Sequence, residues 1–285
     1  MQIYTRTPTL TAMTAAGLDH VSGGRFTLGI GASGPQVVEG FHGVAYDAPL
    51  ARTRELVEIC RQVWRREKVE HQGRYYRVPL PSGSGTGLGK PLRLIDTPLR
   101  ARIPVVLAAI GPKNVALAAE VAEGWQPISY YPEKAADVWG PAPRDGLSRR
   151  DPDLGPLDVV VGMRLAIGDD VAGLVELGRP QLALYIGGMG ARSKNFYNDL
   201  ARHYGYEREA QLMQDLYLAG RKEEAAAAVP EELLRATCLV GPLGDVQDRL
   251  QALRAAGVTT LNLTPVAPDH ARRLQDMETV KQLVA

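Results

Sequence analysis

The 285-residue sequence has few cysteines, few aromatic residues and no excess of charge of either sign. Only Cys60 and Cys238 occur, each alone, so neither a disulfide framework nor a zinc site built on clustered cysteines is indicated. A reducing cytoplasm is the expected compartment. The 33 Lys and Arg residues nearly cancel the 32 Asp and Glu residues, so there is no net field to attract nucleic acid or an anionic membrane.

Long apolar runs are missing as well. No stretch of about 18 apolar residues occurs, and residues 1–8 contain neither a basic region nor an apolar region typical of a signal peptide. The five histidines show no metal-ligand spacing. We therefore expect no membrane partner, no nucleic-acid partner and no metal.

What the sequence does contain is an alternation of Ala-rich helices and short apolar strands. In three segments a helix is followed by a glycine and then by a strand: residues 11–30, 114–129 and 245–264. Residues 1–5, 104–109 and 157–167 add three further strands, which makes six in all. Apolar strands that alternate with helices predict a parallel sheet covered by helices, the α/β class.

A periodic helix is predicted over residues 49–66. Leu50, Val57, Cys60 and Trp64 share one face of it, while Arg52, Arg54, Arg61 and Arg65 lie mostly on the other. We expect the apolar face to pack on the sheet and the arginine face to point outward.

Two long segments, at about 67–103 and 168–239, interrupt the alternation, and we interpret both as insertions in a single domain over residues 1–285. The second is predicted to hold several extra helices. The first contains a glycine-rich run, residues 81–91, that departs from the P-loop pattern at Ser84 and Pro91. It is therefore predicted to be a loop.

Residues 29–34 match the pattern G-x-G-x-x-G after a predicted strand. A Rossmann dinucleotide site needs a long helix directly after the last glycine. Here Pro35, Gly40 and Gly43 interrupt, and no long helix is expected before about Pro49. The pattern predicts instead a glycine-rich turn at the carboxyl end of a parallel strand, where α/β proteins bind ligands. A tight turn with no ligand remains the alternative.

A second candidate site is the helix start at Ile110, Gly111, Pro112, Lys113 and Asn114, directly after a strand. Proline at the first helical position leaves free N–H groups at the positive end of the helix dipole. The dipole alone disfavours the cation of Lys113 there, and a bound phosphate resolves that conflict. The alternative is an ordinary helix start with Lys113 in solvent.

Several of these segments together resemble the luciferase-like monooxygenase superfamily, and within it the actinobacterial coenzyme F420-dependent oxidoreductases. The pattern D-H-x-S-x-G-R-x-x-L-G-x-G spans residues 19–31, G-P-K-N follows at 111–114, and E-G-W follows at 123–125. The similarity extends over essentially the whole chain.

The resemblance implies a fold, a cofactor and an activity. The fold is a (β/α)8 TIM barrel of the luciferase-like type, with the cofactor across the carboxyl ends of the strands. Hydride transfer between coenzyme F420 and a small organic substrate is the implied reaction. Two alternatives stay open: an FMN-dependent monooxygenase served by a separate flavin reductase, and a non-catalytic cofactor-binding paralogue.

The resemblance also implies where the cofactor binds. Residues at the helix start would hold the phosphate-bearing tail, the glycine-rich turn would line the ring, and a third segment would lie beneath the ring. These residues are Ile110, Gly111, Pro112, Lys113 and Asn114; Gly31, Ala32, Ser33 and Gly34; and Thr5, Arg6 and Thr7. No catalytic acid or base is assigned, because turn hydrogen bonding explains Ser33 and Gln36 equally well and Glu39 is expected to be exposed.

A complete family barrel has eight strands, whereas six are predicted here. The chain is expected to begin near the end of the third barrel strand, without the first two βα units. Met1 is then either an internal methionine or the true start of a shortened protein. A homodimer is expected by resemblance, but one helix of the family's usual interface falls in the missing part.

Overall fold

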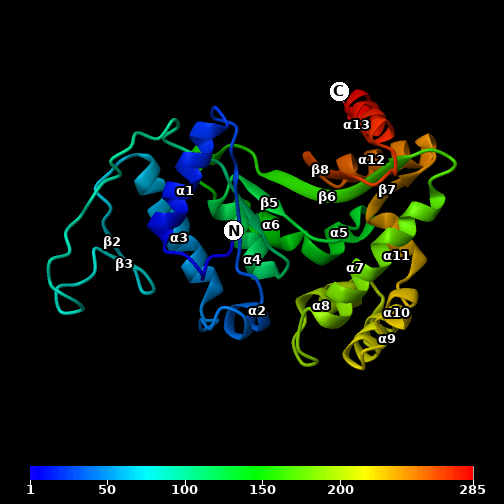
Figure 1. Ribbon diagram of the computed structural model, residues 1–285, viewed down its shortest axis with the longest axis horizontal. Helices are drawn as coiled ribbons and strands as arrows, with labels where there is room; N and C mark the ends of the chain where they lie inside the picture. Colours follow the sequence, from blue (N-terminus) through cyan, green and yellow to red (C-terminus); the bar gives the residue numbers. More distant parts are fainter. Residues whose placement is uncertain (285) are drawn as a thin grey trace. The chain divides into compact units, whose positions relative to one another are not determined.

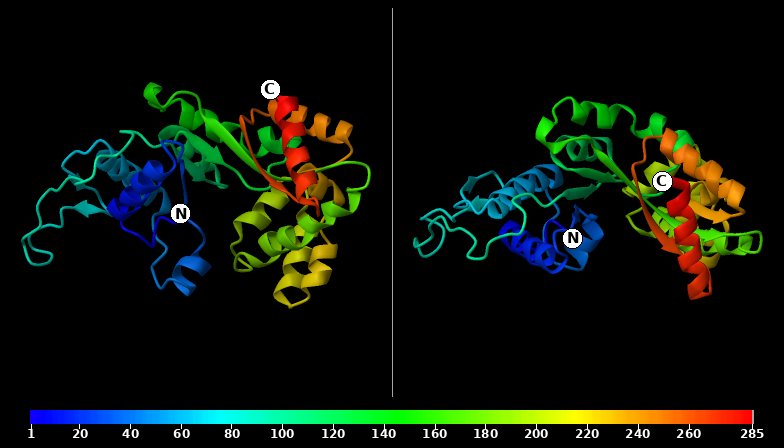
Figure 2. Two further views of the ribbon diagram at one scale, coloured as in Figure 1. Left: turned by 45° about the horizontal axis from the view of Figure 1, so that its top comes forward. Right: turned by 90° about the horizontal axis from the view of Figure 1, so that it is seen from above.

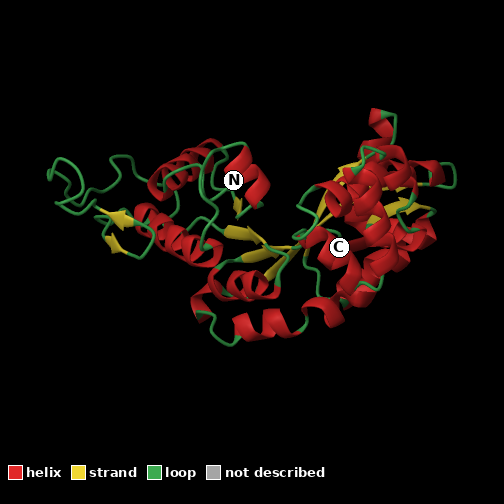
Figure 3. Ribbon diagram, turned by 90° about the horizontal axis from the view of Figure 1, so that it is seen from below, coloured by secondary structure: helices red, strands yellow, loops and turns green. Residues whose placement is uncertain are grey.

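A computed structural model describes residues 1–284, and the chain divides into two compact units (Figure 1). Of the described residues, the first unit comprises 1–109, 113–125 and 143–157, and the second comprises 110–112, 126–142 and 158–284. In each unit helices flank parallel strands (Figure 3). Among the described residues, no helix is long and apolar enough to cross a membrane.

The strands of the first unit are short, apolar and parallel. β1 (Leu28–Gly31) pairs with β4 (Val105–Ala108), so that Gly31 lies opposite Ala108. β5 (Gly124–Gln126) is the next strand beyond β4. The strand predicted over residues 1–5 is reduced to a single parallel bridge between Gln2 and Gly31, because the chain turns away from β1 after Ile3.

Proline opens the main helices of the first unit, as it does at many helix N-termini. These are α1 (Pro8–Val21), α2 (Pro35–Gly40), α3 (Pro49–Trp64) and α4 (Pro112–Val121), followed by α6 (Pro141–Leu147) and the 3₁₀ turn Pro152–Leu154. Of the predicted apolar face of α3, Val57, Cys60 and Trp64 are at most 1% exposed, as predicted, whereas Leu50 in the first turn is only half-buried. The Trp64 indole N–H donates to the carbonyl of Ala12 at 3.0 Å and fixes α3 against α1.

The first inserted segment leaves the end of α3 and extends away from the strands of its unit (Figure 2). It contains a hairpin, β2 (His71–Gln72) and β3 (Arg77–Val78), that the sequence did not predict. The carboxylate of Glu55 on α3 holds the hairpin turn, because it accepts the backbone N–H groups of Arg74, Tyr75 and Tyr76 at 3.0, 3.1 and 2.8 Å. Residues 81–91 form a loop, as predicted.

The second unit is built around the long strand β6 (Asp158–Ile167). Its residues 160–165 pair in parallel with β8 (Thr260–Pro265), and its residues 164–167 pair in parallel with β7 (Cys238–Gly241). β7 was not predicted, and it begins at the end of the second insertion, which was predicted to hold several extra helices. Its four residues follow directly on a helix, so they give no periodic signal of their own.

Helices make up most of the rest of the second unit, as predicted for the second insertion. They are α5 (Pro132–Trp139), α7 (Arg179–Ala183), α8 (Phe196–His203), α9 (Glu207–Leu218), α10 (Lys222–Ala227), α11 (Glu231–Ala236), α12 (Leu243–Ala255) and α13 (His270–Val284), with a 3₁₀ helix at Ala172–Gly178 and a π turn at Leu184–Gly188. Glycine is needed in that π turn, because a Cβ on Gly187 would lie 2.6 Å from the Cβ of Tyr217 on α9.

Candidate cofactor site

The glycine-rich turn lies at the carboxyl end of β1. The N–H of Gly31 donates to the carbonyl of Met1 at 3.0 Å, and its carbonyl accepts the N–H of Ile3 at 3.2 Å. A Cβ on Gly31 would lie 3.3 Å from the Cβ of Ala108, so glycine permits the close approach of β4. Ala32 is buried, whereas Ser33 is exposed and has a left-handed φ of 59°. The turn therefore presents one strained, exposed residue at the strand end.

A short helix follows this turn. α2 begins directly after Gly34, which no sequence pattern predicted, and it ends after six residues at Gly40. The first long helix after the turn is α3, which begins at Pro49 as predicted. The pattern at residues 29–34 therefore lacks the long helix that a Rossmann site needs.

The segment Thr5, Arg6 and Thr7 is exposed and leads into α1. Thr7 is the N-cap of this helix, and its hydroxyl accepts the N–H of Leu10 at 3.3 Å. The side chain of Thr7 therefore has a capping role, while Thr5 and Arg6 are exposed. Because Met1 and Ile3 bond to Gly31, this segment and the glycine-rich turn belong to one part of the first unit.

A group of tyrosines surrounds Arg52, and it was not predicted. The guanidinium carbon of Arg52 lies 4.9, 5.6 and 5.7 Å from the ring centroids of Tyr75, Tyr76 and Tyr4. We call Arg52 and these three rings the tyrosine cage. The only hint in the sequence was the adjacent pair Tyr75 and Tyr76 within the first insertion.

The second candidate segment follows β4. α4 begins at Pro112, which confirms the predicted helix start. Just before this helix, the carbonyl of Ile110 accepts the indole N–H of Trp139 at 2.9 Å. Lys113 is exposed and lines a shallow groove with Leu50 and Ala51 of α3, and it forms no ion pair among residues 1–284.

Lys113 and Asn114 group with the first unit, whereas Ile110, Gly111 and Pro112 group with the second. The structure thus pairs residues 1–3, just before Thr5, with Gly31, and it leaves Lys113 exposed in the first turn of α4.

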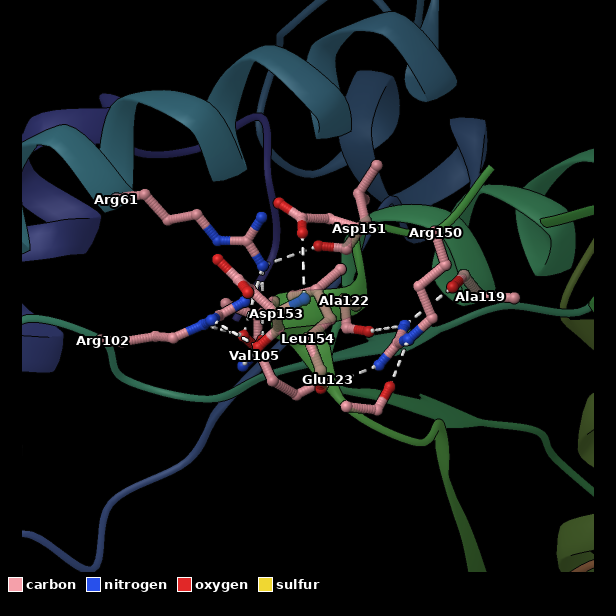
Figure 4. Close-up of polar contacts among 12 residues, drawn as sticks. Arg61, Arg102, Val105, Ala119, Ala122, Glu123, Arg150, Asp151, Asp153 and Leu154 are labelled. Carbon is pink, nitrogen blue, oxygen red and sulfur yellow. Dashed lines mark hydrogen bonds and ion pairs between the residues drawn. The ribbon is translucent and has the colours of Figure 1, made fainter. Parts of the chain in front are cut away.

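A polar cluster occupies the other end of β4 (Figure 4). Glu123 accepts the N–H of Val105, the first residue of β4, at 2.8 Å, and it also pairs with Arg61 at 3.3 Å and Arg102 at 2.9 Å. Arg150 adds a hydrogen bond to the carbonyl of Ala119 at 2.7 Å. Glu123 therefore ties α3, through Arg61, and the segment before β4, through Arg102, to the start of β4.

This cluster also corrects the predicted arginine face of α3. Arg61 and Arg52 are only 20% and 22% exposed in their side chains, because Glu123 and the tyrosine cage cover them. Arg54 and Arg65, at 41% and 46%, are more exposed, as predicted. A helical periodicity identifies the polar face, but it does not reveal that distant segments pack on it.

Comparison with known proteins establishes the family. Residues 1–260 match the family model described as luciferase-like monooxygenase. The chain therefore belongs to the luciferase-like monooxygenase family, which confirms the resemblance.

Individual relatives and a solved structure agree with this assignment. A putative coenzyme F420-dependent oxidoreductase of Mycobacterium tuberculosis is 45% identical over 280 residues, covering 96% of this chain and 80% of that protein. A 5,10-methylenetetrahydromethanopterin reductase of Archaeoglobus fulgidus is 28% identical, covering 95% of this chain and 77% of that protein. The structure of the coenzyme F420-dependent tetrahydromethanopterin reductase of Methanopyrus kandleri superposes with a TM-score of 0.78 at 23% identity, covering 99% of this chain and 81% of that one. The predicted fold, an α/β barrel of the luciferase-like type, is confirmed.

Proposed function

We propose that this protein is a coenzyme F420-dependent oxidoreductase that transfers a hydride between the deazaflavin and a small organic substrate. The observation that carries the proposal is the identity with the mycobacterial F420-dependent oxidoreductase over nearly the whole chain. F420, when bound, supplies the hydride-carrying ring, so the protein has to bind the cofactor, orient it and exclude water.

The residues at the strand ends fit such a cofactor. The exposed residues Ser33, Thr5 and Arg6 would hold the ring region. Lys113 is a cation without an ion pair among residues 1–284, at the first turn of a ten-residue helix, so it suits a phosphate. We propose Ile110, Gly111, Pro112, Lys113 and Asn114 for the phosphate-bearing tail. The proposed ring site consists of Gly31, Ala32, Ser33, Gly34 and the Thr5–Thr7 segment.

Turnover with FMN and oxygen is the second candidate, because the matching family is named for monooxygenases. Reduced deazaflavin is expected to react poorly with oxygen, so the oxygen dependence of turnover separates the two. Turnover under anaerobic conditions with F420 supports the first candidate. Turnover that needs FMN, a flavin reductase and oxygen supports the second.

We further propose one domain over residues 1–285, a cytoplasmic location and a homodimer. Both cysteines are free and buried, which suits a reducing compartment. Size-exclusion chromatography with light scattering checks the dimer, with a mass near twice 30.9 kDa as the expected result.

A fluorescence titration of the purified protein with F420, in parallel with FMN, tests the cofactor. Saturable binding of F420 alone is expected, followed by F420 reduction or oxidation with a panel of alcohols, enones and imines. Tight binding of FMN and not of F420 would contradict the proposal. Binding of F420 without turnover over the whole panel would favour a non-catalytic paralogue.

A further inference from the structure

Arg52 lies at the centre of a set of contacts that the proposed function does not use. Besides the tyrosine cage, its guanidinium forms a forked ion pair with Asp47, with Nε 3.1 Å from Oδ1 and one terminal nitrogen 3.2 Å from Oδ2. The planar guanidinium both stacks on rings and binds a carboxylate with two nitrogens, which Lys does not do. The arrangement depends on arginine itself and not merely on a positive charge.

The contacts lead from Arg52 to the glycine-rich turn. Tyr4 donates its hydroxyl to the carbonyl of Asp47 at 2.8 Å, and its ring lies 5.2 Å from that of Tyr46. The hydroxyl of Tyr46 in turn donates to the carbonyl of Ser33 at 3.4 Å. Ser33 is the residue with the left-handed backbone at the end of β1, so Tyr46 contacts the turn where it is most strained.

The contacts also lead to the segment before α1. Tyr76 donates its hydroxyl to the carbonyl of Ile3 at 3.3 Å, two residues before Thr5. Burial raises the pKa values of Tyr4, Tyr46 and Tyr76 above their ordinary value. All three phenols therefore stay protonated at neutral pH and keep their hydrogen bonds.

We propose that Arg52 is a positioning residue for the cofactor ring. By holding Tyr4 and Tyr76 directly, and Tyr46 through the ring of Tyr4, it sets the Ser33 turn and the Ile3–Thr7 segment in their binding conformation. The proposal rests on the proposed function, since it names the device that shapes the ring site. Arg52 itself contacts no part of that site. It acts through the tyrosines, with the hairpin turn held from the other side by Glu55.

The first test measures the free protein by hydrogen exchange, without cofactor. Arg52→Met is expected to speed exchange in residues 31–40 and 73–78 and to leave residues 113–121 unchanged. Arg65→Met is the matched control, because Arg65 lies at the end of the same helix and pairs with Glu67 on the surface. Equal exchange in Arg52→Met and the wild type would overturn the proposal.

The second test measures F420 affinity by fluorescence in a double-mutant cycle. Arg52→Met is expected to weaken binding about tenfold, whereas Arg65→Met changes it less than about twofold. Arg52→Lys is expected to restore little of the F420 affinity, since lysine forms neither the forked ion pair with Asp47 nor the stacking on the rings. Tyr46→Phe weakens binding, and adding it to Arg52→Met costs little more, because both act on Ser33.

The outcomes separate this inference from the proposed function. If the wild type fails to bind F420, the proposed function and the inference both fail. If the wild type binds F420 and Arg52→Met binds it equally well, only the inference fails. Additive effects of Arg52→Met and Tyr46→Phe would also overturn it. If Arg52→Met does not fold, Arg52→Lys and Tyr46→Phe give the same cycle.

Discussion

The carboxylate of Asp19 is fully buried and binds the guanidinium of Arg100 through two hydrogen bonds of 2.5 and 3.1 Å, across 81 residues of sequence. Arg100 also donates to the carbonyl of Phe26 at 2.6 Å. Asp19 is the first residue of the pattern that carried the family resemblance. The pair fixes the end of the first insertion to α1, so this aspartate serves the fold and not the chemistry.

Removing the Asp19 charge should destabilise the protein. Asp19→Asn removes the negative charge and replaces one of the two acceptor oxygens by an NH2 donor that faces the guanidinium, and we expect a loss of about 2–4 kcal/mol in the free energy of unfolding. Urea unfolding at pH 7 measures it. Arg100→Met is the partner variant, and the double variant should lose less than the sum of the two single ones. A loss below about 0.5 kcal/mol would mean that the pair contributes no more than a surface ion pair.

The same pair should make stability depend on pH. Hydrogen bonding from Arg100 holds the pKa of Asp19 below its usual value. Its contribution is therefore fully present above the unfolded pKa of about 3.9 and is lost as the pH falls through the lower folded pKa. We expect the stability difference between the wild type and Asp19→Asn to shrink below about pH 4. A difference that stays constant from pH 7 to acid would contradict the assignment.

Lys113 should contribute to F420 affinity only through its ionic contact with the phosphate of the cofactor tail. Lys113→Met is expected to weaken F420 binding about five- to tenfold at low salt, and less at high salt. Affinity for a deazaflavin without the phosphate tail should not change. Lys68→Met, another exposed lysine of the first unit, is the control. Equal weakening for both ligands would place Lys113 near the ring instead.

Glycine and proline explain why much of the fold could be predicted. Pro49 and Pro112 open α3 and α4 as expected. Three of the predicted apolar runs form the strands β1, β4 and β5. β2 and β3 were missed because each has only two residues, most of them polar, and β7 was missed because no glycine or proline separates it from the helix before it. Their stability comes from packing that no local pattern records.

The candidate site was predictable only in part. The family resemblance indicated the turn at Ser33 and the helix start at Lys113, and their roles in binding stay predictions. The tyrosine cage was missed because its members come from the chain start, from α3 and from the hairpin, tens of residues apart. Helical periodicity assigned Arg52 to solvent, and only the fold brings the rings to it.

Ser33 offers a test of backbone strain at the proposed ring site. Its φ of 59° disfavours a side chain, so Ser33→Gly is expected to stabilise the protein by up to about 1 kcal/mol. Ser33→Ala keeps the strain and removes only the hydroxyl, so it should not stabilise. Thermal unfolding of both variants decides this. A destabilised Ser33→Gly would show that the serine side chain stabilises the turn more than its backbone strain costs.

The two thiols report separately on the two units. Burial raises the pKa of Cys60 to about 12, and burial also raises that of Cys238. Both should therefore resist an aromatic disulfide reagent at pH 8 in the native protein and react fully in denaturant.

The thiol of Cys60 also reports on the contact between α1 and α3. Cys60 lies on α3, with its thiol against the carbonyl of Pro8 at the start of α1. Asp19→Asn should therefore speed labelling of Cys60 more than that of Cys238. Mass spectrometry of the labelled peptides gives both rates. Rapid labelling of Cys60 in the native wild type would contradict its burial. Equal acceleration of labelling at both cysteines in Asp19→Asn would mean that the variant loosens the whole molecule and not the contact between α1 and α3.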